Sequence, residues 1–98
     1  MPIKGVTLKE EGIILSILKP FLKKYDFYFY GSRVKGNFRP LSDLDILVVS
    51  ENCINANDIE SLKQGFDESL LPYVVNFSYN VDTNFYKLIE RDLIKVEV

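Results

Sequence analysis

Residues 30–49 read YGSRVKGNFRPLSDLDILVV, and the order of residue types in this stretch decides the fold. Gly31 and Ser32 follow an aromatic run and begin a segment rich in loop-forming residues. Ten residues separate Ser32 from Asp43, and Asp43 and Asp45 precede a run of apolar residues. The stretch therefore predicts two strands joined by a loop, with a glycine-serine turn after the first strand and paired carboxylates at the start of the second.

The two strands differ in their apolar pattern. Residues 26–30 (DFYFY) are dense in aromatics, which favour strands, and alternation places the two phenylalanines on one face and the two tyrosines on the other. The second strand covers residues 43–50, and its continuous apolar run at 46–49 is typical of a strand covered on both faces near the middle of a sheet. Between them, residues 31–40 form a loop with a short helical turn at 32–35.

A helix is predicted before the first strand. Thr7 and Glu10 have the spacing of a capping box, in which each side chain accepts a hydrogen bond from the backbone of the other residue. Apolar residues then recur at helical spacing, at Ile14, Ile17, Leu18, Phe21 and Tyr25. Pro20 removes one backbone donor, so we expect a helix followed by a short second turn.

A second helix and two further strands are predicted after the apolar strand. Asn57 begins a box-like helix start, Pro72 ends the helix, and the apolar face consists of Ile59, Leu62, Phe66 and Leu70. A strand over residues 73–79, a short helix over 83–91 and an alternating edge strand over 93–98 complete the order. These elements predict one α/β (α+β) domain with a sheet flanked by helices.

Missing residue types exclude much of enzyme chemistry. The 98 residues contain no histidine, which excludes catalytic triads and histidine-ligated zinc. The single cysteine excludes an internal disulfide and a paired-cysteine metal site. Carboxylate, hydroxyl, lysine and arginine chemistry remains, with oxygen ligands for a hard cation such as Mg²⁺.

Charge and hydropathy limit the kinds of partner that this chain is expected to have. The net charge of −2 speaks against nonspecific nucleic-acid binding. Residues 1–39 hold eight basic and three acidic side chains, whereas residues 40–98 hold four and eleven, which could place a phosphate site beside a cation site. The longest apolar runs are far shorter than the roughly 20 residues of a membrane span, and the N-terminus lacks the apolar segment of a signal peptide. We expect a cytoplasmic protein without a membrane partner.

The glycine-serine turn and the aspartate pair suit a metal-bound nucleoside triphosphate. Gly31 lacks a Cβ, so a phosphate can approach the backbone there closely, and a helical turn at Ser32 would point its free amides and hydroxyl at the same anion. Asp43 and Asp45 are two apart on a strand and face the same way, about 6.6 Å apart along the chain. Either motif alone is common in surface turns and strand starts. Together they predict a triphosphate and Mg²⁺ site.

This arrangement resembles the signature of the nucleotidyltransferase superfamily, in particular its minimal domains that partner HEPN proteins in prokaryotic toxin–antitoxin pairs. The residues that match the pattern are Gly31, Ser32, Arg33, Gly36, Ser42, Asp43, Asp45 and the run 46–49. The resemblance spans nearly the whole chain and implies one minimal nucleotidyltransferase domain over residues 1–98, with a palm-like fold and a central mixed sheet.

The resemblance also implies roles for individual residues. Gly31, Ser32, Arg33 and Ser42 would bind the nucleotide, and Asp43 and Asp45 would be catalytic residues that hold Mg²⁺. The reaction implied is transfer of a nucleoside monophosphate, AMP from ATP, to a hydroxyl of a protein. The expected partner is a HEPN toxin, for which this chain would act as antitoxin, and the chain would form a homo-oligomer or a hetero-oligomer.

One position departs from the family pattern. Active relatives carry a third carboxylate on the next strand, where this chain has Asn76. Neighbouring strands lie about 4.8 Å apart, so residue 76 can sit beside the aspartates. We expect Asn76 to belong to the catalytic site with the two aspartates, as a weak metal ligand through its amide oxygen or as a positioning group. An amide brings no charge and cannot accept a proton, which predicts a slow enzyme or, alternatively, a module that binds nucleotide or only its partner. Asp82 could replace the missing carboxylate if the strand register shifted.

Overall fold

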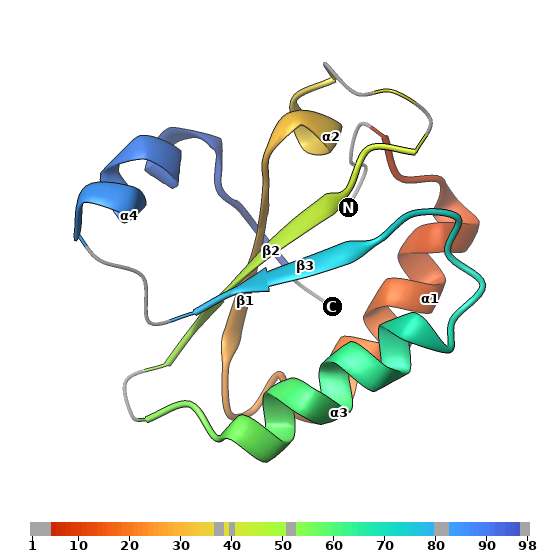
Figure 1. The fold of residues 1–98 in the computed structure, drawn as a ribbon, viewed down its shortest axis with the longest axis horizontal. Coiled ribbons are helices and arrows are strands. Elements are labelled where there is room, and N and C mark those ends of the chain that lie inside the picture. The colour runs from red at the N-terminus through yellow and green to blue at the C-terminus, as the bar shows by residue number, and fades with distance from the viewer. Residues whose placement is uncertain (1–4, 37–38, 40, 51–52, 80–82, 97–98) are drawn as a thin grey trace.

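The computed structural model describes residues 5–36, 39, 41–50, 53–79 and 83–96. Helices and strands follow one another in the predicted order (Figure 1). Their bounds are α1 Leu8–Leu18, a 3₁₀ turn Lys19–Phe21, β1 Asp26–Tyr30, α2 Ser32–Lys35, β2 Leu44–Val49, α3 Ala56–Asp67, β3 Val75–Ser78, α4 Thr83–Ile89, a second 3₁₀ turn Glu90–Asp92, and β4 Ile94–Lys95.

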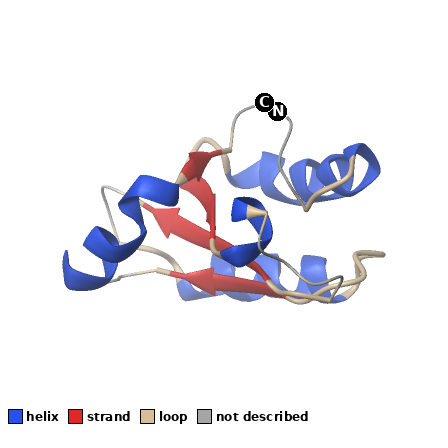
Figure 2. Cartoon of the chain, turned by 90° about the horizontal axis from the view of Figure 1, so that it is seen from above, coloured by secondary structure: helices blue, strands red, loops and turns tan. Residues whose placement is uncertain are grey.

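The strands form one mixed sheet in the order β3-β2-β1-β4. β1 pairs antiparallel with β2 and with β4, whereas β2 and β3 are parallel. The expected mixed sheet is confirmed, and so is the interior position of the apolar strand β2. Of the edge strand expected over 93–98, the described residues form β4 only at Ile94–Lys95, and residues 97–98 lie outside the described part of the chain. Helix α1 and helix α3 lie on one side of the sheet and α4 lies on the other (Figures 1 and 2).

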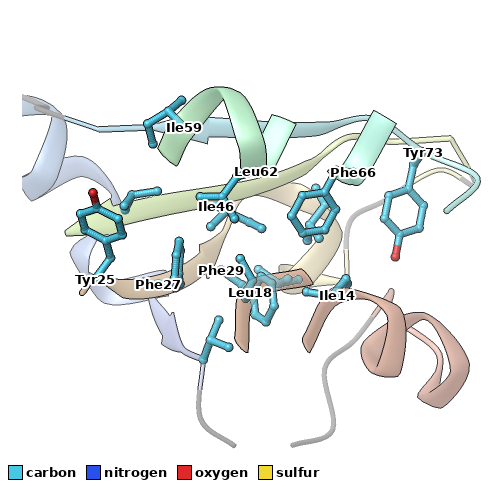
Figure 3. Close-up of a cluster of buried hydrophobic side chains, with 14 residues drawn as sticks. Ile14, Leu18, Tyr25, Phe27, Phe29, Ile46, Ile59, Leu62, Phe66 and Tyr73 are labelled. Atoms are coloured by element: carbon cyan, nitrogen blue, oxygen red, sulfur yellow. The ribbon is translucent and has the colours of Figure 1, made fainter. Parts of the chain in front are cut away.

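The hydrophobic core fills the space between the sheet and the two long helices. Side chains from β1 and β2 meet side chains from α1 and α3 (Figure 3), and Phe27 and Phe29 are completely buried among them. The two phenylalanines of β1 therefore face α1 and α3, as the alternation predicts. The aspartates, at odd-numbered positions of the β2 segment, belong to the opposite face of the sheet, where polar side chains can meet a ligand.

Local signals at α1 are confirmed. The backbone N–H of Glu10 donates to Thr7 Oγ1 at 3.1 Å, and the backbone N–H of Thr7 donates to Glu10 Oε1 at 3.2 Å, which forms the capping box. The α-helix ends at Leu18 and Pro20 lies in the 3₁₀ turn that follows. Proline has no N–H to donate, so the helix changes to this shorter turn there.

The ends of α3 differ from the prediction. Asn55, not Asn57, caps the helix, because its side-chain oxygen accepts the N–H of Asn57 at 2.8 Å. The helix ends at Asp67, where the Ser69 hydroxyl donates to the carbonyl of Phe66 at 2.6 Å and replaces the next helical bond. Leu70 therefore lies beyond the helix and is 84% exposed instead of joining the apolar face.

Two further elements are shorter than expected. β3 covers Val75–Ser78 within the predicted range 73–79, and α4 ends at Ile89. Asp82, the alternative third carboxylate, lies outside the residues that the structure describes. None of the described helices combines the length and the apolar character that crossing a membrane requires.

Candidate active site

The sheet register places the key polar residues side by side. Asp45 on β2 lies opposite Asn76 on β3 and opposite Tyr30 on β1. Residues that are register partners in neighbouring strands point to the same face of the sheet. Asp45 is therefore flanked by Asn76 on one side and by Tyr30 on the other. The predicted position of Asn76 beside the aspartate pair is what the structure shows.

Asn76 joins the two carboxylates. Its Nδ2 atom lies 2.9 Å from Asp43 Oδ2 and 3.5 Å from Asp45 Oδ1, so one amide donates to both aspartates. The bond to Asp43 has ordinary hydrogen-bond length, and the one to Asp45 is long and weak. One oxygen of each carboxylate thus points to the same position, the amide nitrogen of Asn76. Asp43 itself directly precedes Leu44, the first residue of β2.

Gly31 lies directly against Asp45. Its backbone φ of +89° with ψ of −175° is a conformation that residues with side chains avoid. A Cβ added at Gly31 would overlap a carboxylate oxygen of Asp45 and would come within 3.2 Å of its Cγ. The missing side chain is therefore required twice, once by the backbone angle and once by the neighbouring carboxylate. The glycine-serine turn and the aspartate pair meet in space.

The two serines of the motif occupy different positions. Ser32 is exposed at the first residue of α2, next to Gly31. The hydroxyl of Ser42 accepts the backbone N–H of Arg39 at 2.8 Å and closes the turn that leads to Asp43. Contact of either serine with a phosphate stays a prediction.

Arg33 is placed differently from the expected phosphate-binding residue. Only 3% of its surface is exposed, and its guanidinium donates to the backbone carbonyls of Gly5, Arg39 and Ser42. The guanidinium carbon also lies 3.8 Å from the ring centre of Tyr73. A guanidinium held in this way is used by the fold, so the structure does not support its assignment to the nucleotide.

The electrostatics of the site follow from burial and repulsion. Partial burial raises the pKa of Asp45, the hydrogen bond from Asn76 lowers that pKa, and the nearby charge of Asp43 raises it again. The net effect is a raised pKa, because one amide donor does not compensate for lost water and a second carboxylate. A cation that binds between the two carboxylates would reduce their mutual repulsion.

A pair of hydroxyl groups beside the aspartates was not predicted. Tyr30 and Ser78 are hydrogen-bonded through their hydroxyl oxygens at 2.7 Å, and the ring of Phe85 from α4 packs edge-on against Tyr30. Burial raises the pKa of Tyr30, the bond with Ser78 lowers it, and the charge of Asp45 raises it, with a net increase. Ser78 follows Asn76 by two residues on β3, and that spacing is the sequence signal that could have identified it.

The donor set fits a hard divalent cation with few protein ligands. Asp43 and Asp45 offer carboxylate oxygens to one point, and Asn76 could offer its amide oxygen if the group rotated. In the part of the chain that the structure describes, no cluster of three or more acidic, cysteine or histidine side chains suits a metal ion. The protein thus supplies two carboxylates, and a nucleotide's phosphates would have to supply further oxygens.

Comparison with known families agrees with this geometry. The sequence profile described as "Nucleotidyltransferase domain" matches residues 12–98, which include both aspartates, Gly31 and Asn76. The chain belongs to this family.

A curated relative narrows the comparison. Over 68 residues the chain is 37% identical to the "Probable protein adenylyltransferase MntA" of Haemophilus influenzae. The matched segment covers 69% of this chain and 60% of the relative. The match thus spans less than two thirds of the relative's length.

Replacing Gly31 tests the contact between the turn and Asp45. We predict that Gly31→Ala lowers the free energy of unfolding by about 1–3 kcal/mol, because alanine is strained at this φ and its Cβ overlaps the carboxylate. Gly12→Ala is the matched control. No atom lies within 4 Å of its added Cβ, and it should stabilise helix α1 by about 0.5–1 kcal/mol. Urea unfolding followed by circular dichroism measures both, and equal stability of the two variants would refute the contact.

The raised pKa of Asp45 predicts a stability change that depends on pH. The pKa in the folded protein lies above the unfolded value of about 3.9, so this group favours folding most at low pH and loses that contribution as the pH rises through its folded-state pKa. At pH 7 without metal, Asp45→Asn should raise the melting temperature by only a few degrees, because solvent around this partly exposed carboxylate screens the repulsion.

Melting curves between pH 7 and pH 3 in the presence of a chelator test this expectation. The gain should shrink toward acid, where the wild-type carboxyl becomes neutral. Glu60→Gln, at an exposed position on α3, should leave the melting temperature nearly unchanged. A lower melting temperature for Asp45→Asn at pH 7 would contradict the electrostatic description of the site.

Proposed function

We propose that this chain is a Mg²⁺-dependent protein adenylyltransferase, which transfers AMP from ATP to a hydroxyl group of a partner protein. The observation that carries the proposal is the meeting of Asp43 and Asp45 with the side-chain-free turn at Gly31. Membership of the nucleotidyltransferase domain family supports the reaction class. The name of the relative MntA, a probable protein adenylyltransferase, supports AMP as the group and protein as the acceptor.

The roles of this chain's residues follow from their positions. Asp43 and Asp45 would hold the cation, which when bound neutralises charge on the phosphates during the transfer. Gly31 has no Cβ to overlap the carboxylate of Asp45, and Ser32 would donate its hydroxyl to a phosphate oxygen. The acceptor oxygen bonds to the α-phosphorus while the bond from that phosphorus to the pyrophosphate oxygen breaks. Pyrophosphate leaves with the bonding electrons.

Asn76 affects how the acceptor hydroxyl loses its proton. A third carboxylate at this position could take the proton, but an amide cannot. A general base typically accelerates such a reaction by about 10²–10⁴-fold. Without one the proton passes to water, so we expect slow turnover. Asn76 instead donates to both aspartates and holds them together before the cation arrives.

The proposed partner is a HEPN toxin, and modification of the toxin would make this chain its antitoxin. The acceptor protein must reach the face of the sheet that carries the aspartates. Leu41 and Val74 precede Asp43 and Asn76 by two residues each, and they are 73% and 59% exposed. Exposed apolar side chains beside a polar site support contact with another protein there.

Asn76 also favours a second candidate function. In that alternative the chain binds nucleotide, or only its partner, and neutralises the toxin by covering it without chemistry. The lack of a three-carboxylate cluster among the residues that the structure describes is the observation that favours it.

Labelling separates the two functions. Purified chain, Mg²⁺ and ATP labelled at the α-phosphate are incubated with the product of the neighbouring gene, which we take as the proposed HEPN partner. We predict that the wild-type chain labels the partner slowly, that Asn76→Asp accelerates labelling by up to about 10²–10⁴-fold, and that Asp45→Asn abolishes it. Glu60→Gln, at an exposed position on α3 away from Leu41 and Val74, should label like wild type.

Two outcomes would change the conclusion. Label that appears only with Asn76→Asp supports the binding-only function for the natural chain. No label from either folded protein, with Asn76→Asp as inactive as Asp45→Asn, would refute adenylyl transfer.

A further inference from the structure

Arg33 is a charged side chain buried in the interior of the domain. The sequence pattern predicts that it binds a phosphate of the nucleotide. Burying a guanidinium is costly unless its N–H groups find acceptors. Arg33 is 3% exposed, and its three nitrogens find backbone carbonyls: Nε donates to Ser42 at 2.7 Å, Nη1 to Gly5 at 2.7 Å and Nη2 to Arg39 at 3.2 Å. One side chain thus connects the turn at residues 39–42 with Gly5, which lies 28 residues before Arg33.

Two of these carbonyls belong to the turn that leads to Asp43. The carbonyl of Ser42 belongs to the peptide bond that joins Ser42 to Asp43, so holding it fixes the plane from which Asp43 departs. The carbonyl of Arg39 belongs to the same turn, which Ser42 closes by accepting the N–H of Arg39 with its hydroxyl. Arg33 therefore restrains both ends of the turn that presents Asp43.

The guanidinium is itself held in place by Tyr73. Its carbon lies 3.8 Å from the centre of the Tyr73 ring, and the hydroxyl of that ring donates to Glu10 Oε1 at 3.0 Å. Burial and the Glu10 carboxylate raise the pKa of Tyr73 far above its ordinary value, although Arg33 lowers it, so the hydroxyl keeps its proton and remains a donor. The next residue, Val74, accepts the N–H of Leu44 at 2.9 Å. The starts of β2 and β3 are thereby fixed at the same place.

We propose that Arg33 is a positioning residue for the metal site: it fixes the turn before β2 so that Asp43 meets Asp45 and Asn76. The inference rests on the proposed function for the identity of the cation. A planar guanidinium can donate in three directions and stack on a ring at once. A lysine ammonium provides the charge but not that geometry.

Binding experiments distinguish positioning from phosphate contact. Mn²⁺ is titrated into wild type and Arg33→Lys in the presence of a non-hydrolysable ATP analogue and followed by electron paramagnetic resonance. We expect the dissociation constant for Mn²⁺ to rise by about 10–100-fold in Arg33→Lys, the usual effect of losing an outer support of a metal ligand. Binding of the analogue in the presence of a chelator should stay within about twofold of wild type. The control Arg91→Lys, at an exposed position, should change neither constant.

A measurement without metal separates failure of this inference from failure of the proposed function. Hydrogen exchange of the Leu44 amide, followed by NMR in metal-free protein, should become faster in Arg33→Lys, because the turn before it loses its anchor. Faster exchange together with a weakened Mn²⁺ site is the expected result. Unchanged exchange, unchanged Mn²⁺ affinity, or loss of analogue binding in the chelator would overturn the inference.

Variants of Tyr73 keep the test decisive if Arg33→Lys does not fold. Tyr73→Phe keeps the ring over the guanidinium and loses only the bond to Glu10, whereas Tyr73→Leu removes the ring. Positioning through the stacked guanidinium predicts weaker Mn²⁺ binding for Tyr73→Leu than for Tyr73→Phe. Equal Mn²⁺ affinities in these two variants would also overturn the inference.

Discussion

The close approach of Gly31 to Asp45 is the constraint on which the candidate site depends. Antiparallel pairing of β1 with β2 sets Tyr30 opposite Asp45, so the residue after Tyr30 must pass over the carboxylate. Only a residue without a Cβ can do so at a φ of +89°. The same turn then starts α2 at Ser32. Strand register and the missing side chain of Gly31 together place the glycine-serine turn directly against Asp45.

The charges around this contact explain why the site is prepared for a cation. Asp45 loses water and faces Asp43, both of which raise its pKa. A single amide from Asn76 reaches the two carboxylates and relieves the repulsion only in part. Without a cation, the two negative carboxylates repel each other. A cation bound between them would remove this unfavourable electrostatic energy. Binding of a metal-chelated triphosphate is consistent with this arrangement, whereas rapid proton transfer requires a base that Asn76 cannot be.

Much of the fold could be predicted because its signals are local. Three local patterns each predict one element, and the structure confirms all three. They are the aromatic run before Gly31, the apolar run after Asp45 and the capping box at Thr7. The position of Asn76 beside the aspartates followed from strand spacing. Arg33 could not be placed in this way, because its partners are backbone carbonyls that no residue type reveals. For the same reason the cap at Asn55 and the helix end at Ser69 depend on hydrogen bonds that several neighbouring residues could have made.

A crystal of the chain grown with Mg²⁺ and a non-hydrolysable ATP analogue tests the central claim most directly. We expect a cation bonded to carboxylate oxygens of Asp43 and Asp45 at roughly 2.0–2.1 Å, the length of Mg²⁺–oxygen bonds, with the triphosphate beside the Gly31 backbone. Aspartates bonded to no cation, with the analogue bound elsewhere or absent from a site that calorimetry also finds silent, would contradict it.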